Sequence, residues 1–168
     1  MNLLTKAALV AAALALAACN NPRGGAMDGD GWGPGGSGIG STALGDPNDP
    51  TSIAYFNQTI GDRVFFTVDQ SDLSAEAMAT LRQQAVWLNQ NPQYVILIEG
   101  HADERGTREY NVALGARRAN SVEQYLIQQG VSAGRLRTVS YGKERPVEAC
   151  AAQRCWDLNR RAVTAVSR

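Results

Sequence analysis

The apolar and polar positions after residue 60 alternate between two patterns, one typical of strands and one typical of helices. The β-branched and aromatic run Arg63–Asp69 predicts a strand, and the almost wholly apolar run Tyr94–Glu99 predicts a central strand that is buried on both faces. Two further runs, Leu136–Tyr141 and Ala162–Val166, predict two more strands towards the carboxyl end.

Two helices are expected between these strands. The first, Ser74–Asn91, carries apolar residues at spacings of three and four, with Ser74 as N-cap and Pro92 as its stop. The second runs from about Thr107 to Gln129 and ends at Gly130, which suits the C′ position of a helix. Strands that alternate with helices predict a two-layer α/β sandwich, in which helices cover one face of a sheet.

The amino-terminal segment has a different pattern. The apolar run Ala7–Ala18 follows Lys6 and has twelve residues, so as a helix it would reach only about 18 Å, well short of a membrane core of about 30 Å. It is therefore expected to be a secretory signal peptide. Leu16–Cys19 resembles a bacterial lipobox, which implies cleavage before Cys19 and lipidation of that residue. The alternative is a cysteine that merely follows an ordinary signal peptide. Asn20, in place of Asp, favours sorting to the outer membrane.

Composition separates a linker from a domain. Residues 20–50 hold ten of the seventeen Gly and four of the six Pro, which is typical of a flexible tether. We therefore expect a signal peptide over 1–18, a lipidated Cys and linker over 19–50, and one domain over 51–168. Sixteen basic residues balance sixteen acidic ones, so the charge gives no footprint for binding nucleic acid.

The densest polar cluster, Gly100–Asn111, lies between the second strand and the second helix, where α/β folds commonly bind ligands. Further along this helix, Arg118 falls on the apolar stripe, spaced by four from Leu114 and from Val122. A guanidinium that faces inward needs a partner, and Asp103 is the obvious candidate. Two interpretations follow: a structural Asp–Arg salt bridge, or a ligand site.

Enzymatic chemistry has little support in the sequence. His101 is the one histidine, and it lacks the spacing of a metal-binding motif, so we expect it to be a hydrogen-bonded structural residue. No G-x-S-x-G motif supplies a nucleophile. We therefore expect a protein that is not an enzyme and that uses no cofactor or metal.

Four motifs, taken in order, are highly specific. They are Gly100-His-Ala-Asp-Glu-Arg-Gly-Thr107, Leu114-Gly-Ala-Arg-Arg-Ala119, Val139-Ser-Tyr-Gly-Lys-Glu-Arg-Pro146 and Asn159-Arg-Arg-Ala-Val163. On these motifs, the sequence from Val64 to Val166 is similar to the OmpA-like peptidoglycan-binding domain family. This resemblance implies an α/β (α+β) fold with a mixed four-stranded sheet covered by helices on one face.

The same resemblance implies a function and a set of site residues. The domain is expected to bind the diaminopimelate of the peptidoglycan stem peptide non-covalently, with Asp103 and Arg118 holding its zwitterionic end. A carboxylate that accepts from an ammonium and a guanidinium that forks onto a carboxylate suit this role. Five further positions match those that line the family's pocket: Asp69, Arg105, Thr107, Asn111 and Leu114.

Partners and location are also implied by resemblance. We expect the periplasmic β-propeller TolB and other Tol proteins as partners, in envelope integrity and cell division. The lipid at Cys19 would anchor the protein in the outer membrane of a Gram-negative bacterium, with the domain in the periplasm. A stator- or porin-associated domain of the same fold is the alternative, although neither a membrane-spanning helix nor barrel strands precede the domain in this sequence.

The remaining two cysteines lie close together in sequence. Cys150 and Cys155 fall in a segment, Ala149–Trp156, that we expect to be a loop, where many relatives have no cysteine. In an oxidising periplasm we expect them to form a disulfide that staples this loop; two free thiols are the alternative.

Overall fold

The computed structural model describes residues 44–168, so the expected signal peptide, Cys19 and most of the linker lie outside the described residues. The elements, in chain order, are α3 (Ile53–Tyr55), the π-helix η1 (Phe56–Gly61), β1 (Arg63–Phe65), α4 (Ala75–Gln90), β2 (Val95–His101), α5 (Arg108–Gln128), the 3₁₀ helix η2 (Ala133–Arg135), β3 (Leu136–Gly142), α6 (Gln153–Asn159) and β4 (Arg161–Ser167).

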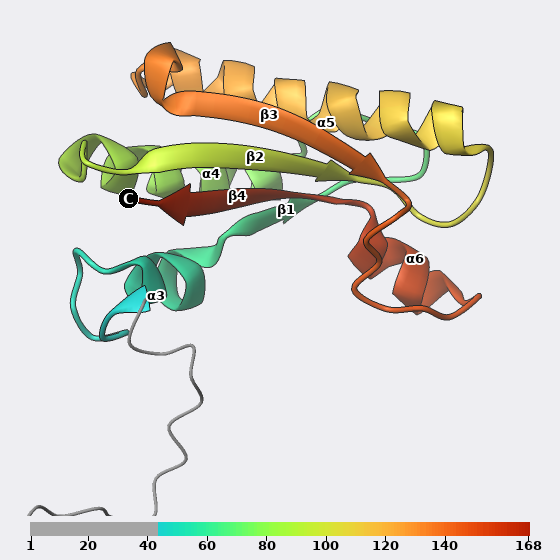
Figure 1. Cartoon of the computed structure of the whole chain (residues 1–168), viewed down its shortest axis with the longest axis horizontal. Helices are drawn as coiled ribbons and strands as arrows, with labels where there is room; N and C mark the ends of the chain where they lie inside the picture. Colours follow the sequence, from blue (N-terminus) through green and yellow to red (C-terminus); the bar gives the residue numbers. More distant parts are fainter. Residues whose placement is uncertain (1–43) are drawn as a thin grey trace, which may run out of the picture. The chain divides into compact units, whose positions relative to one another are not determined.

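The four strands form one mixed sheet in the order β1-β4-β2-β3 (Figure 1). Strand β4 is antiparallel to both of its neighbours, whereas β2 and β3 are parallel. In the centre of the sheet, Ile98 of β2 lies opposite Thr138 of β3 and Thr164 of β4. The predicted fold class, a mixed four-stranded sheet with helices packed on it, is confirmed.

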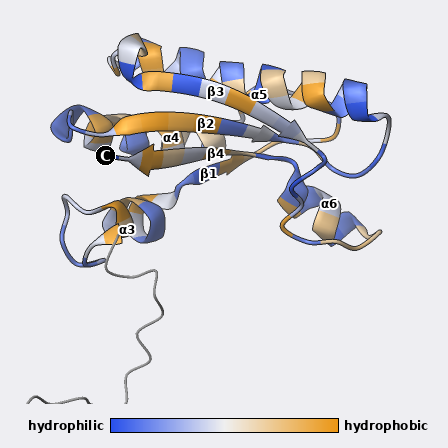
Figure 2. Cartoon of the chain, in the orientation of Figure 1, coloured by the Kyte–Doolittle hydropathy of each residue, from blue (hydrophilic) through white to orange (hydrophobic). Residues whose placement is uncertain are grey.

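Helices α4 and α5 pack against the sheet and against each other. The core contains alternate residues of β2 and the inward faces of the two helices: Ile96, Ile98, Leu81, Leu88, Val122 and Leu126 are all fully buried. Strand β2 is apolar along its first residues and polar at its end, as its change from orange to blue shows (Figure 2). The first part of the strand therefore contributes to the core, and its carboxyl end carries polar residues.

The helix starts follow the expected caps. The Ser74 hydroxyl accepts from the Ala77 N–H at the start of α4, and the Thr107 hydroxyl accepts from the Tyr110 N–H at the start of α5. Such side-chain acceptors satisfy N–H groups that have no partner within the helix. After α5 the backbone of Gly130 has a φ of 91°, which favours glycine at this position.

The structure differs from the prediction in several elements. The first strand ends at Phe65 instead of Asp69, because its pairing with β4 ends at Phe65 and Arg161, and only one further backbone hydrogen bond, from the Phe66 N–H to the Arg160 carbonyl, follows. Cys155 lies in α6, so the segment before the last strand is not wholly a loop. The short helices α3, η1 and η2 have no counterpart among the predicted elements.

The amino-terminal part of the described chain packs on the domain. The Trp87 indole N–H donates to the Pro50 carbonyl at 2.6 Å, and the Ser52 hydroxyl donates to the Asp46 carbonyl at 2.5 Å. Hydrogen bonding around the domain therefore begins a few residues before Thr51. The predicted boundary at residue 50 stays a prediction.

Candidate functional site

A cavity of about 320 Å³ lies between the loop before α5, the first half of α5 and the chain segment after β1. Its lining residues are Val68, Asp69, Asp103, Arg105, Gly106, Tyr110, Asn111, Leu114, Arg118 and Arg160. Two groups of these face the cavity from different elements. We call Asn111, Leu114 and Arg118 of α5 the helix wall, and residues 103–106 the arm.

The helix wall is built from residues three and four positions apart, which share one face of an α-helix. Leu114 and Arg118 are buried, and the Arg118 guanidinium has no exposed surface. It donates to three carbonyl oxygens that come from two distant segments, those of Gln70 at 2.9 Å, His101 at 2.7 Å and Thr67 at 3.1 Å. A guanidinium has five N–H donors, so Nη1 and Nη2 each keep one for a further acceptor.

Burial shifts the acid–base behaviour of this guanidinium. Loss of hydration, followed by the nearby positive charge of Arg160, lowers the pKa of Arg118 to about 10. The side chain is still cationic at neutral pH. The helix wall therefore offers a fixed positive charge at the back of the cavity.

The arm begins with Asp103, whose carboxylate is buried but paired twice. Arg160 donates to its Oδ2 at 3.2 Å, and Arg105 donates to both oxygens, at 3.2 and 2.7 Å. Burial alone would raise the pKa of Asp103, but the hydrogen bonds from Arg105 and Arg160 outweigh it, and the net pKa is lowered. Asp103 therefore remains a carboxylate at neutral pH.

The interpretation of Arg118 and Asp103 as a structural salt bridge is wrong. Arg118 bonds to backbone carbonyls, while Asp103 pairs with Arg105 and Arg160, so the two side chains line one cavity without forming an ion pair. A purely structural Asp–Arg bridge therefore does not account for the inward position of Arg118.

Local backbone features hold the arm in place. Gly106 has a φ of 86°, a left-handed conformation that favours glycine, and it directly precedes the N-cap of α5. The Asn111 side chain donates to the Arg105 carbonyl at 2.7 Å, and the Lys143 ammonium donates to the Gly106 carbonyl at 2.7 Å. The arm is thus tied to α5 and to the segment after β3.

A second carboxylate-bearing residue reaches the cavity from the segment after β1. Asp69 has a φ of 59° and accepts a hydrogen bond from the Tyr110 hydroxyl. Both residues are exposed, so this side of the cavity is open to solvent. Asp69 adds a second negative charge opposite the guanidinium of Arg118.

His101 lies next to the site but does not line the cavity. Its ring is buried, and neither ring nitrogen has a hydrogen-bond partner, contrary to the predicted hydrogen-bonded residue. Burial, together with the positive charges of Arg161 and Arg145, lowers the pKa of His101 to about 4. Only the His101 backbone carbonyl takes part in the site, as an acceptor for Arg118.

Six of the seven predicted binding residues line the cavity: Asp69, Asp103, Arg105, Asn111, Leu114 and Arg118. Thr107 does not, because its side chain caps α5. The sequence interpretation missed Gly106, Tyr110 and Arg160 among the lining residues. Arg160 could have been suspected from the Asn159-Arg160-Arg161 motif, where two cations precede an apolar strand.

The arrangement suits binding of a ligand that carries both charges. The cavity offers two carboxylates, those of Asp69 and Asp103, and three guanidiniums, those of Arg105, Arg118 and Arg160. Within residues 44–168, no group of three or more metal-binding side chains comes together. None of the helices in that range is long and apolar enough to cross a membrane.

Comparison with known proteins gives the class. The sequence profile of the OmpA family matches residues 65–155. The peptidoglycan-associated lipoprotein of Mesorhizobium japonicum is 58% identical over 118 residues, which cover 70% of each chain. That of Haemophilus influenzae is 40% identical over 98% of this chain and 99% of its own.

Solved structures agree. The peptidoglycan-associated lipoprotein from Burkholderia pseudomallei matches with a TM-score of 0.65 and 39% identity, over 74% of this chain and 99% of its own. The carboxyl-terminal domain of Helicobacter pylori MotB shares the fold, with a TM-score of 0.60 at 23% identity, over 64% of this chain and 84% of its own.

These matches cover most of the chain, in sequence and in fold. The protein therefore belongs to the OmpA family and, within it, to the peptidoglycan-associated lipoproteins. Proteins of this family are non-enzymatic, in agreement with the prediction that the chain is not an enzyme.

Proposed function

We propose that the domain binds peptidoglycan non-covalently by holding the zwitterionic end of a diaminopimelate side chain in the cavity between the arm and the helix wall. The observation that carries this proposal is that the buried guanidinium of Arg118, of whose five N–H groups three bond to the protein, lines one cavity with the carboxylates of Asp69 and Asp103. A ligand carboxylate would accept from Arg118, and the ligand ammonium would donate to the carboxylates.

The volume and charge of the cavity support this ligand class. About 320 Å³ accommodates the end of an amino-acid side chain but not a folded partner. Leu114 and Val68 supply apolar lining for the methylene stem of such a side chain. Opposite charges in one cavity favour a zwitterion over an ion of one sign, because a singly charged ligand is attracted to one kind of charge and repelled by the other.

The cellular role follows from the family and from the amino terminus. In this proposal, acyl chains on Cys19 hold the protein in the outer membrane, and the Gly-rich linker lets the periplasmic domain reach the cell wall. The protein would then act with TolB and the other Tol proteins of the Tol–Pal system in envelope integrity and cell division. Palmitate labelling of wild type, absent from Cys19→Ala, would support the anchor; equal labelling would contradict it.

The binding proposal is tested with residues 20–168, which contain the whole described fold. Purified sacculi are pelleted with this protein, and free diaminopimelate is added as competitor. We expect co-sedimentation of wild type that the competitor abolishes, and at least tenfold weaker binding by Asp103→Asn, a loss of about 1.4 kcal/mol.

Arg117→Ala is the matched control, because Arg117 is the exposed neighbour of Arg118 and does not line the cavity. We expect this control to bind as wild type does. Binding by Asp103→Asn equal to wild type, or binding that free diaminopimelate leaves unchanged, would show that the cavity is not the site.

A further inference from the structure

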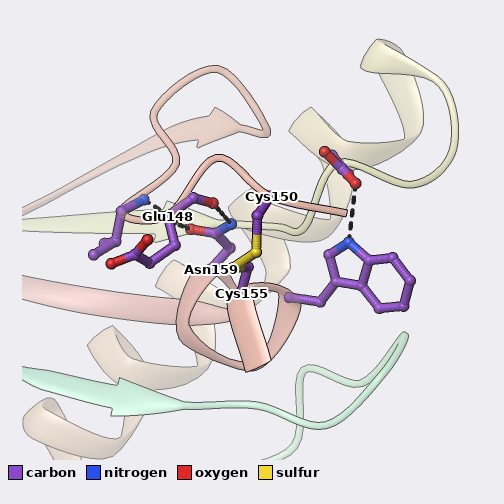
Figure 3. The surroundings of a disulfide bond; sticks show 7 residues. Glu148, Cys150, Cys155 and Asn159 are labelled. Carbon is purple, nitrogen blue, oxygen red and sulfur yellow. Dashed lines mark hydrogen bonds between the residues drawn. A yellow bond between two sulfur atoms is a disulfide. The ribbon is translucent and has the colours of Figure 1, made fainter. Parts of the chain in front are cut away.

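A disulfide links helix α6 to the chain segment before it. The residue that directly follows this disulfide contacts the arm. Cys150 and Cys155 form a disulfide with their Cα atoms 5.8 Å apart, and the Cys155 side chain is buried (Figure 3). The next residue along the helix is Trp156. The position of its indole therefore depends on where the disulfide holds the start of α6.

The Trp156 indole contacts two neighbouring residues of the arm. Its Nε1–H donates to a Glu104 carboxylate oxygen at 3.0 Å, and its ring lies 4.3 Å, measured to the centroid, from the Arg105 guanidinium carbon. A guanidinium over an aromatic face is attracted to it. Arg105 in turn holds both carboxylate oxygens of Asp103. A continuous set of contacts therefore runs from the disulfide through Trp156 and Arg105 to Asp103.

Helix α6 is short and has two further polar attachments, an ion pair between Asp157 and the buried Arg160 and the hydrogen bonds of Asn159. It has seven residues, and Ala152 at its N-cap gives no side-chain hydrogen bond. Helices this short are not stable alone. At its other end the Asn159 amide accepts from the Val147 N–H at 2.7 Å and donates to the Glu148 carbonyl at 2.8 Å (Figure 3). The main core cluster of the described residues includes no residue of α6.

We propose that Trp156 is a positioning residue for cell-wall binding, and that the Cys150–Cys155 disulfide keeps it in place. This inference rests on the proposed function of the cavity. The indole fixes Arg105, and Arg105 fixes the Asp103 carboxylate in the direction that a ligand ammonium requires. Cell-wall affinity then depends on the oxidation state of the two cysteines.

Chemical reduction is the direct way to break the Cys150–Cys155 disulfide. A dithiol reductant breaks the S–S bond, gives two electrons and two protons to form the Cys150 and Cys155 thiols, and becomes a disulfide itself. The start of α6 then loses its covalent link to the preceding segment, and the Trp156 side chain becomes more mobile. The core that holds the helix wall is unaffected, because it does not involve α6.

The experiment measures affinity for a soluble diaminopimelate-containing stem peptide by calorimetry, with and without reductant, on residues 20–168. We expect reduction of wild type, and equally Cys150→Ala/Cys155→Ala, to weaken binding about fivefold, equal to about 1 kcal/mol. Trp156→Ala should weaken binding by a similar factor, and reduction of that variant should change it no further. Trp156→Phe, which keeps a ring beside Arg105, should restore most of the affinity.

Arg154→Ala is the matched control, because Arg154 is exposed on the same helix, and we expect wild-type affinity and a wild-type response to reductant. Hydrogen exchange of residues 103–107 gives a second measurement that needs no ligand, and we expect faster exchange on reduction. This measurement also reports on variants in which binding is weak.

Two results would overturn the inference. One is an unchanged affinity on reduction while the melting temperature falls, since the disulfide would then be only a structural staple. The other is a full response to reductant in Trp156→Ala. A third result separates the two proposals. If oxidised wild type does not bind the peptide, but reduction still speeds hydrogen exchange in residues 103–107, the proposed function is wrong, whereas the positioning of the arm by Trp156 is still supported.

Discussion

The helix wall and the arm face each other across the same cavity, but different kinds of contact hold them. Arg118, on the helix wall, is fixed by carbonyls of the chain segments that surround the core, and α5 beneath it packs on the sheet. In the arm, Asp103 pairs with the buried Arg160, whereas Glu104 and Arg105 contact Trp156 of α6, and Lys143 donates to the Glu104 carbonyl. The positive charge of Arg118 is therefore held by the fold alone, whereas the negative charge of Asp103 is held partly by the fold, through Arg160, and partly by a peripheral helix, through Arg105.

This difference predicts that removing Arg118 affects stability as well as binding. Arg118→Ala leaves the buried His101 carbonyl and the partly buried carbonyls of Thr67 and Gln70 without their donor. We expect a loss of roughly 3–5 kcal/mol in the free energy of unfolding, measured by urea denaturation, because three hydrogen bonds from a charged group and the packing of a large buried side chain are lost together.

Arg117→Ala again serves as the control and should change the free energy of unfolding by less than about 0.5 kcal/mol. Arg118→Lys should fall between the two, because an ammonium cannot reach three separate carbonyls in the planar geometry of a guanidinium. Stability of Arg118→Ala equal to wild type would mean that the helix wall is no more a part of the fold than the arm.

The second prediction concerns the end of β2, which supplies the carbonyl for Arg118. The pKa of His101 is about 4 in the fold, against an ordinary value of 6.5, so the unfolded chain binds the proton more tightly. Stability is therefore full above pH 6.5 and falls as the pH decreases towards 4. We expect a loss of roughly 2–3 kcal/mol between pH 7 and pH 4.5, because each tenfold difference in proton affinity between the two states corresponds to about 1.4 kcal/mol.

Thermal or urea unfolding of wild type and His101→Gln across this range tests the prediction. The variant has no group that titrates at this position, so its stability should fall much less between pH 7 and pH 4.5. An equal fall in both proteins would assign the pH dependence to other groups.

The third prediction concerns the base of the arm. Asp103→Asn removes the negative charge that faces Arg160 and Arg105, and we expect a loss of about 1–2 kcal/mol in the free energy of unfolding at pH 7. The pKa of Asp103 is lowered in the fold from 3.8, so its contribution is complete above that pH and is lost as the pH falls below it. The stability difference between the two proteins should therefore shrink below pH 3.8.

Glu109→Gln, an exposed carboxylate on the first turn of α5, is the control for a general loss of charge. At neutral pH it should lower the free energy of unfolding only by the few tenths of a kcal/mol, up to about 1 kcal/mol, that a carboxylate in the first turn of a helix contributes. A stability difference between Asp103→Asn and wild type that persists unchanged well below pH 3.8 would contradict the assignment to the carboxylate.

The helix wall is more accessible to prediction than the arm, because its signal is local. A spacing of four places Arg118 on the apolar stripe of α5, and a single residue type marks each N-cap, at Ser74 and Thr107. Such patterns depend only on neighbouring positions in the chain.

The arm depends on contacts between distant segments, which leave no periodic signal. Arg160 and Arg161 are adjacent cations, and no sequence pattern indicates that only Arg160 lines the cavity, where it meets Asp103, 57 positions away. Helix α6 is too short for apolar periodicity and has no side-chain cap, so its sequence predicts a loop. The early end of β1 likewise follows from where β4 begins.

The smallest expected effect lies at the open side of the cavity and separates ligand binding from stability. Tyr110→Phe removes the hydroxyl that donates to Asp69, and both residues are exposed, so unfolding should change by less than about 0.5 kcal/mol. Because this hydrogen bond orients the Asp69 carboxylate, binding of the stem peptide should weaken by about twofold in calorimetry. If the free energy of unfolding falls more than the free energy of binding, Asp69 is part of the fold, as the helix wall is. We expect the binding free energy to fall more, because the position of Asp69 serves ligand binding.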